Sequence, residues 1–208
     1  MKLYFIRHGQ TTHNAAGRCQ GWSPVRLSEL GMEQARAARE YVGKIPFDRI
    51  HCSDLLRTKQ TCELIFPEAY KAKQIIFEED IREINNTIVA GRKSAEMIEI
   101  YGETYRQCPR NLDYSLYGGE SSAHLRERVA RFMDRVRAEA EAEGLETIAA
   151  VAHGGVIHAA FTNVCGAPPE VSANQIPFIV DNCSVHVFEW RQDKWWIKAL
   201  NYRGEGTI

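Results

Sequence analysis

The feature that most constrains the fold is a short apolar run, Leu3–Ile6, that stops abruptly at Arg7, His8 and Gly9. A run of this length followed by a glycine is typical of a buried strand that ends in a sharp turn. Open α/β sheets bind their ligands at this end of their strands. The fork of an arginine matches phosphate oxygens, and a histidine nitrogen can attack phosphorus and form a covalent intermediate. Arg7 and His8 therefore indicate a ligand site.

A second strand pattern ends in the same way. The run Thr147–Ala152 is followed by His153, Gly154 and Gly155. In a mostly parallel sheet, His8 and His153 can reach the same crevice at the carboxyl ends of the strands. The two glycines allow close backbone approach, and the helix expected from about residue 156 to 164 would direct free N–H groups there. The pattern indicates an anion site.

Strand and helix patterns alternate along the chain, and we therefore expect an α/β fold. It would be a three-layer sandwich, a mixed, mostly parallel sheet flanked by helices on both faces, with a hairpin at the sheet edge. We expect residues 1–208 to form a single domain, in which the irregular stretch of about residues 85–119 is inserted as a small cap. Further strands are expected at 49–52 and 75–77, helices at about 28–43, 53–66 and 120–143, and the hairpin at 184–189 and 194–200.

Charge and cysteine content exclude several classes of function. The net charge is −1 and no long run of one sign occurs, which disfavours nucleic acids and membranes as partners. The start of the chain has no signal-peptide pattern, and no apolar run is long enough to cross a membrane, so we expect a cytoplasmic protein. The six cysteines form no metal-binding pattern, so we expect mostly buried free thiols, no metal and no other cofactor. The sequence leaves open whether the chain forms a homodimer.

Four motifs, in chain order, resemble those of the histidine phosphatase superfamily, the phosphoglycerate-mutase-like enzymes. The first is the opening segment Phe5–Thr11 with Asn14, and the second is Ser53–Thr61, which contains Arg57. The third is Ile81–Ile84, and the last is the His153–Gly155 segment. Supporting matches occur at Gln20-Gly21, Leu27–Gly31 and Gly118–Ser121, so the resemblance extends from residue 1 to about residue 160.

The resemblance implies a metal-independent phosphatase that hydrolyses small phosphorylated metabolites in two steps. His8 would attack phosphorus and form a phosphohistidine, while Glu83 would protonate the departing alcohol and later activate water. Arg7, Arg57 and His153 would hold the non-bridging phosphate oxygens, and further phosphate or substrate contacts would come from Asn14, Gln20, Gly21 and Gly154. Without the resemblance, the ordinary interpretations would be an exposed helical arginine at 57 and a core histidine at 153.

The sequence departs from the family pattern directly after Glu83. Family phosphatases often continue with an aromatic-Gly-x-Trp-Glu-Gly stretch, whereas this chain has Asn85–Gly91. Phosphoglycerate mutases usually carry Glu-Arg-His-Tyr-Gly here and a longer insert, so the short segment favours a phosphatase of the alpha-ribazole or broad-specificity sugar-phosphate kind. Two alternatives remain: a cofactor-dependent phosphoglycerate mutase, and an inactive phosphate-binding or interaction module on the same fold.

Overall fold

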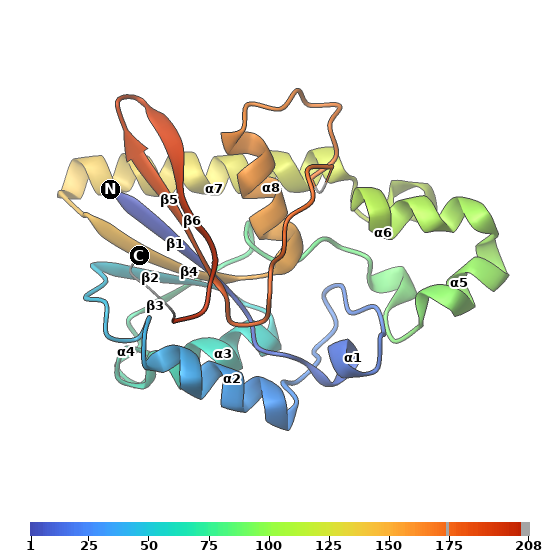
Figure 1. The fold of residues 1–208 in the computed structure, drawn as a ribbon, viewed down its shortest axis with the longest axis horizontal. Coiled ribbons are helices and arrows are strands. Elements are labelled where there is room, and N and C mark those ends of the chain that lie inside the picture. The colour runs from blue at the N-terminus through green and yellow to red at the C-terminus, as the bar shows by residue number, and fades with distance from the viewer. Residues whose placement is uncertain (174, 205–208) are drawn as a thin grey trace.

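A six-stranded sheet forms the centre of the computed structural model, which describes residues 1–173 and 175–204 (Figure 1). The strands lie in the order β3-β2-β4-β1-β5-β6. Neighbours among the first four pair in parallel, and β5 and β6 add an antiparallel hairpin. The predicted mixed, mostly parallel sheet is confirmed. The strands are β1 (Lys2–Arg7), β2 (Arg49–Ser53), β3 (Ile75–Glu78), β4 (Thr147–Ala152), β5 (Val185–Arg191) and β6 (Lys194–Tyr202).

Helices cover both faces of the sheet, as expected. Side chains of β1 alternate between the two faces: Tyr4 and Ile6 belong to one buried cluster, and Leu3 and Phe5 belong to the other. The first cluster is covered by α2 (Glu29–Arg39), α3 (Leu56–Ile65) and α4 (Pro67–Lys71), and the second by α7 (Ser122–Glu143) and α8 (Gly154–Val164). A strand that is buried on both faces needs apolar side chains on both, which explains the continuous apolar run of β1.

Local signals explain most element ends and show where the predicted bounds were wrong. Ser28 caps α2 by accepting a hydrogen bond from the Gly31 backbone N–H at 3.1 Å, but this helix ends at Arg39 rather than near residue 43. Pro67 follows the end of α3 and is also the first residue of α4, where its missing N–H costs nothing. Gly144 ends α7 with a φ of +72°, as its position in the sequence predicted.

The stretch from residue 85 to 119 forms short helices beside the sheet (Figure 1, right). Tyrosine rings pack together here: Tyr101, Tyr105 and Tyr117 have ring centroids 4.8 to 6.3 Å apart. Its elements are η1 (Thr87–Val89), α5 (Ser94–Tyr101), η2 (Glu103–Arg106), α6 (Gln107–Asn111) and η3 (Ser115–Tyr117). Another short helix, α1 (Thr12–Ala15), follows β1 directly.

Two further expectations can be compared with the structure. All six cysteines are free thiols, and Cys52, Cys62, Cys108 and Cys183 are buried, whereas Cys165 is exposed. None of the helices within the described ranges combines the length and the apolar character needed to cross a membrane.

Candidate active site

His8 lies just beyond β1 and is almost fully buried. Its Nδ1 atom lies 2.7 Å from the carbonyl oxygen of Gly9. Because a carbonyl can only accept, this contact places the ring proton on Nδ1 and leaves the lone pair on Nε2. Burial lowers the pKa of His8 well below its usual value, and the charges of Arg57 and Arg7 lower it further. His8 is therefore neutral near pH 7, with a free nitrogen lone pair.

His153 lies at the end of β4, beside His8. The parallel register pairs Arg7 with Ala152, so the residues that follow the two strands are neighbours. Their ring centroids are 5.2 Å apart. His153 Nε2 lies 2.9 Å from the hydroxyl oxygen of Ser53, while its buried Nδ1 has no hydrogen-bond partner within the described residues. Burial, followed by the charge of Arg57, lowers its pKa well below the usual value.

Two guanidinium groups lie next to the histidines, that of the buried Arg57 and that of the half-buried Arg7. Arg57, in the first turn of α3, is 1% exposed, so it is not the exposed helical arginine of the ordinary interpretation. One of its nitrogens donates to the Gly21 carbonyl at 3.0 Å, and Arg7 donates to the Val180 carbonyl. In the part of the chain that the structure describes, Nε of Arg7 and Nε and Nη1 of Arg57 are buried without partners. Buried, positively charged hydrogen-bond donors that have no partner are suited to binding an anion.

Burial lowers the pKa of both arginines, to about 10 for Arg57, and the nearby carboxylate of Glu83 opposes this shift in each. Both groups stay charged at neutral pH. Glu83 is thus close enough to both guanidinium groups to influence them electrostatically. Its own carboxylate accepts hydrogen bonds from the backbone N–H groups of Ile84 at 2.9 Å and Gly155 at 3.4 Å.

A cavity of about 170 Å³ is lined by Arg7, His8, Arg57 and Glu83, whereas His153 lies behind its wall, beside His8. Asn14 lines it, although the Asn14 side chain also accepts a hydrogen bond from the Thr11 backbone N–H at 3.1 Å in a capping box. Gln20 lines it as well and accepts from the Thr11 hydroxyl at 2.9 Å. The structure therefore brings together most of the predicted site residues. The cavity is lined by Arg7, His8, Asn14, Arg18, Cys19, Gln20, Gly21, Arg57, Glu83, Ile84, Asn86, Leu112 and Tyr114.

Of the two predicted glycines, Gly21 requires the absence of a side chain and Gly154 does not. Gly21 has a φ of +51°, and a Cβ there would lie 2.6 Å from Asn86 Oδ1, so a side chain would meet both strain and a clash. Gly154 is not part of the cavity wall; a Cβ on it would lie 3.6 Å from Arg7 Nε. It therefore packs against a guanidinium that lines the cavity rather than forming the wall itself.

A larger cavity of about 400 Å³ lies between α6, the start of α7 and residues 169–172. Its walls include Asp113 and Glu170 and none of the histidines or arginines described above. Size alone would select this cavity, but the smaller one contains the charged, buried donors. The chemistry of the lining residues favours the smaller cavity as the active site.

Comparison with known proteins identifies the family. The model of the histidine phosphatase superfamily (branch 1) matches residues 3–203, almost the whole chain. The chain belongs to the histidine phosphatase superfamily. The resemblance seen in the sequence is thereby confirmed, and the protein is an enzyme of this superfamily, of the phosphatase or the mutase-like kind.

Individual histidine phosphatase relatives have both kinds of activity in their names. A metal-independent phosphoserine phosphatase of Arabidopsis thaliana is 32% identical over 202 residues, which cover 95% of this chain and 80% of the relative. A 2,3-bisphosphoglycerate-dependent phosphoglycerate mutase of Gloeobacter violaceus is 33% identical over 171 residues, covering 81% and 77%. The crystal structure of the alpha-ribazole phosphatase from Shigella flexneri superposes with a TM-score of 0.84 at 25% identity, over all of both chains.

Several residues of this histidine phosphatase site were not singled out from the sequence. Ser53 contacts His153, and its place at the end of β2 is the same strand-end signal that marked His8. The cavity walls formed by Arg18, Asn86 and Tyr114 come from loops and short helices, where residue spacing carries no signal.

Proposed function

We propose that this histidine phosphatase superfamily member is a metal-independent phosphatase that hydrolyses small phosphate monoesters through a phosphohistidine on His8. One observation carries the proposal: a neutral histidine, its proton held by the Gly9 carbonyl, lies beside two arginines whose buried nitrogens have no partner within the described residues. A nucleophilic nitrogen and fixed positive charges are the two requirements of phosphoryl transfer without a metal. The small cavity, about 170 Å³, favours small substrates.

In the first step, His8 Nε2 forms a bond to phosphorus as the bond between phosphorus and the ester oxygen breaks. Glu83, in its protonated form, gives its proton to the departing alcohol and becomes ionised. Arg7 and Arg57 donate to the non-bridging oxygens with the buried nitrogens that have no other partner, and Asn14 orients one of these oxygens. His153 adds a further donor from Nδ1, because Ser53 contacts its other nitrogen.

In the second step, ionised Glu83 removes a proton from water, and the water oxygen attacks phosphorus. The bond between phosphorus and His8 breaks, and inorganic phosphate leaves. Glu83 is protonated again, and the lone pair returns to Nε2. Both steps build negative charge on the same oxygens, so the same arginines serve twice.

The experiment that tests this function is hydrolysis of p-nitrophenyl phosphate in excess chelator, with wild type and His8→Ala compared. We expect turnover by wild type that the chelator does not reduce, and loss of turnover in the variant. A phosphorylated wild-type enzyme that is stable in alkali and labile in acid should be trapped by rapid quenching, since a phosphohistidine has this stability.

Other outcomes would select an alternative. Equal turnover by wild type and His8→Ala, or no turnover by either, would remove the enzyme mechanism and leave a phosphate-binding module. Loss of activity in chelator would indicate a metal-dependent phosphatase. Interconversion of phosphoglycerates that requires 2,3-bisphosphoglycerate would identify a mutase.

A further inference from the structure

The segment that carries Glu83 has no regular secondary structure of its own. Strand β3 ends at Glu78 and the next element, η1, begins at Thr87, so residues 79–86 are turns, bends and irregular chain. Such a segment leaves its backbone carbonyl groups without the partners that a helix or sheet would supply. A proton donor on such a segment needs another source of rigidity.

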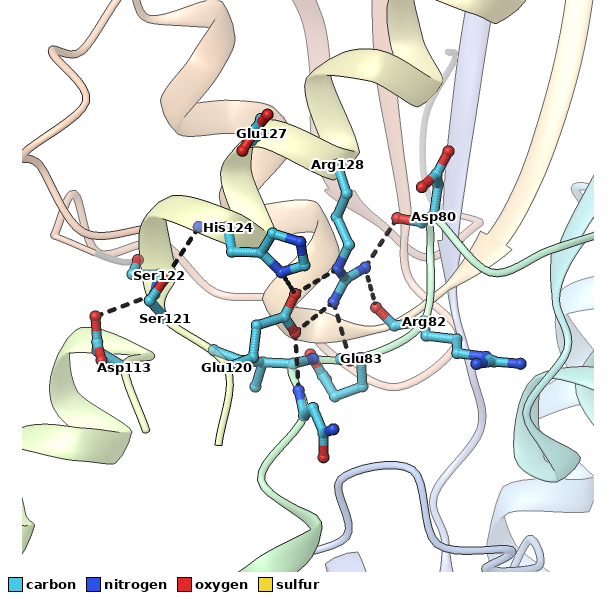
Figure 2. Close-up of polar contacts among 12 residues, drawn as sticks. Asp80, Arg82, Glu83, Asp113, Glu120, Ser121, Ser122, His124, Glu127 and Arg128 are labelled. Carbon is cyan, nitrogen blue, oxygen red and sulfur yellow. Dashed lines mark hydrogen bonds and ion pairs between the residues drawn. The ribbon is translucent and has the colours of Figure 1, made fainter. Parts of the chain in front are cut away.

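One side chain supplies that rigidity. Figure 2 shows that the Arg128 guanidinium, from α7, reaches the backbone on both sides of Arg82. Its Nη1 donates to the carbonyl oxygens of Asp80 at 2.8 Å and Arg82 at 2.6 Å, and its Nη2 donates to that of Glu83 at 3.0 Å. The Glu83 carbonyl also accepts from the Trp22 indole N–H at 2.7 Å. The backbone of Glu83 is therefore held by two side chains from distant parts of the chain.

Glu120 completes the unit from the other side (Figure 2). Its carboxylate receives two bonds from Arg128, from Nε at 2.7 Å and from Nη2 at 2.9 Å. The same carboxylate accepts from the Asn85 backbone N–H at 2.9 Å, and the Glu120 N–H donates to the Asn85 carbonyl at 2.8 Å. Residues 80, 82, 83 and 85 are thus all bound to this one ion pair.

The guanidinium has five N–H donors, and each has a partner here: three carbonyl oxygens and the two oxygens of one carboxylate. Both side chains are 5% exposed. Removing two charges from water carries a desolvation penalty that the attraction between them does not reliably exceed, so added stability is a poor explanation for such a pair. A better explanation is that the pair fixes the geometry of the segment that it binds.

We propose that Arg128 and Glu120 form a positioning pair for the proton donor Glu83, a role that rests on the proposed function. The pair fixes the backbone of residues 80–85, and with it the origin of the Glu83 side chain. Without the pair, the carboxyl group would still be present but would spend less time where the leaving oxygen lies. The loss would fall on proton transfer to the leaving group, because Arg7, His8 and Arg57 lie on or directly beside other elements. His153 receives a smaller effect, since the charge of Arg128 helps to lower the pKa of His153, and Arg128→Lys keeps that charge.

The chain offers a matched control two residues earlier in the same helix. Arg126 is 8% exposed and also gathers backbone carbonyl groups with its guanidinium, but in a different segment. It donates to Ala167, Pro168 and Val171 carbonyl oxygens at 2.6 to 2.7 Å and to Asn163 Oδ1 at 2.9 Å. A replacement of Arg126 therefore reproduces the general damage of losing a buried arginine from α7 and leaves the contacts of Glu83 intact.

The experiment compares Arg128→Met with Arg126→Met on two substrates that differ in leaving group. p-Nitrophenolate leaves with little help from an acid, whereas the alkoxide of β-glycerol phosphate requires a proton. For each enzyme, kcat/KM is measured, since it reports the steps up to release of the alcohol. We expect Arg128→Met to lose about 100-fold on the alkyl ester and less than about 10-fold on the aryl ester. Arg126→Met should lose the same factor on both.

A milder pair of variants covers the case in which Arg128→Met does not fold. Glu120→Gln keeps the shape of the side chain but removes its charge, and Arg128→Lys keeps a charge without the fork that reaches three carbonyl oxygens. Both should lose about 10-fold in kcat/KM on the alkyl ester and less on the aryl ester, which is the same preference to a smaller degree. Combining either with Glu83→Gln should add no further loss on the alkyl ester, because the group that they position is then already absent.

Equal losses on the two substrates, in Arg128→Met and in both milder variants, would overturn the positioning role. That result is distinct from a failure of the proposed function. In that case the wild type would have no phosphatase activity, or the His8→Ala variant would be as active as the wild type. The two substrates and the wild-type control therefore separate the two conclusions.

Discussion

Gly155 allows a direct measurement of how accurately Glu83 has to be placed. A Cβ at residue 155 would lie 2.2 Å from Glu83 Oε1, closer than non-bonded atoms approach, and 3.3 Å from its Cδ, which is a tight contact. The oxygen lies at the far end of a flexible side chain, so it can move away. Restoring an ordinary contact requires a displacement of about 1 Å, and a 1 Å misplacement of a reacting group costs about 100-fold in rate. In free energy this is about 2.7 kcal/mol of transition-state stabilisation.

The expected result of Gly155→Ala is therefore a fold that is intact and a reaction that is impaired. Gly155 is the second residue of α8, where alanine is the better helix former, and this gain opposes the cost of moving the Glu83 carboxylate, so thermal stability should change little. On β-glycerol phosphate, kcat/KM should fall about 100-fold. The assay is steady-state release of inorganic phosphate, with circular dichroism melts of both proteins as the check on folding.

A double-mutant cycle shows whether the loss passes through Glu83. In a Glu83→Gln background, Gly155→Ala should add less than about 3-fold, since no proton donor remains to be displaced. Equal losses in the two backgrounds would refute the reasoning and assign the effect to the helix start or to the cavity wall. An unchanged kcat/KM in the single variant would show that Glu83 tolerates the shift.

Three further predictions follow from the described contacts. Arg57→Lys should lower kcat/KM for p-nitrophenyl phosphate about 100-fold, because an ammonium cannot hold the Gly21 carbonyl and direct two further donors at an anion. Ser53→Ala should lower kcat/KM about 10-fold and also lower the melting temperature, since it leaves the buried nitrogen of His153 that the hydroxyl contacts at 2.9 Å without a partner. Burial lowers the pKa of His186 from 6.5 to about 3, so the unfolded chain binds more protons below pH 6.5 and stability falls as the pH decreases. By about pH 5 this residue should cost about 2 kcal/mol, and urea denaturation of His186→Gln should show a correspondingly shallower pH dependence.

The sheet and the residues at its strand ends could be predicted from the sequence, since short apolar runs closed by glycine have few structural interpretations. Arg7, His8 and His153 were placed correctly because a parallel sheet brings the carboxyl ends of its strands to one edge. Helix bounds were less accurate. Apolar spacing continued to residue 45 and predicted a longer α2, but the chain after Arg39 forms turns in which Val42 is still buried and Ile45 is half-buried.

The supports of the site could not be predicted from residue spacing. Arg128 lies within the apolar stripe of α7, between Leu125 and Phe132, which marks it as buried without showing what it binds. Its partners are backbone carbonyl groups of an irregular segment about 45 residues earlier, and backbone groups leave no trace in a sequence. The same applies to the cavity walls between residues 85 and 119, where short helices follow no single period.

The order of the strands has a consequence for how the protein is made. Strand β1 is synthesised first, yet both of its neighbours, β4 and β5, begin only at Thr147 and Val185. During translation, β1 therefore has no strand to pair with until most of the chain has been synthesised. A nascent chain that stops before β4 also leaves β2 without its central neighbour. We expect protection of β1 against proteolysis to appear late and in one step, together with the ability to bind phosphate.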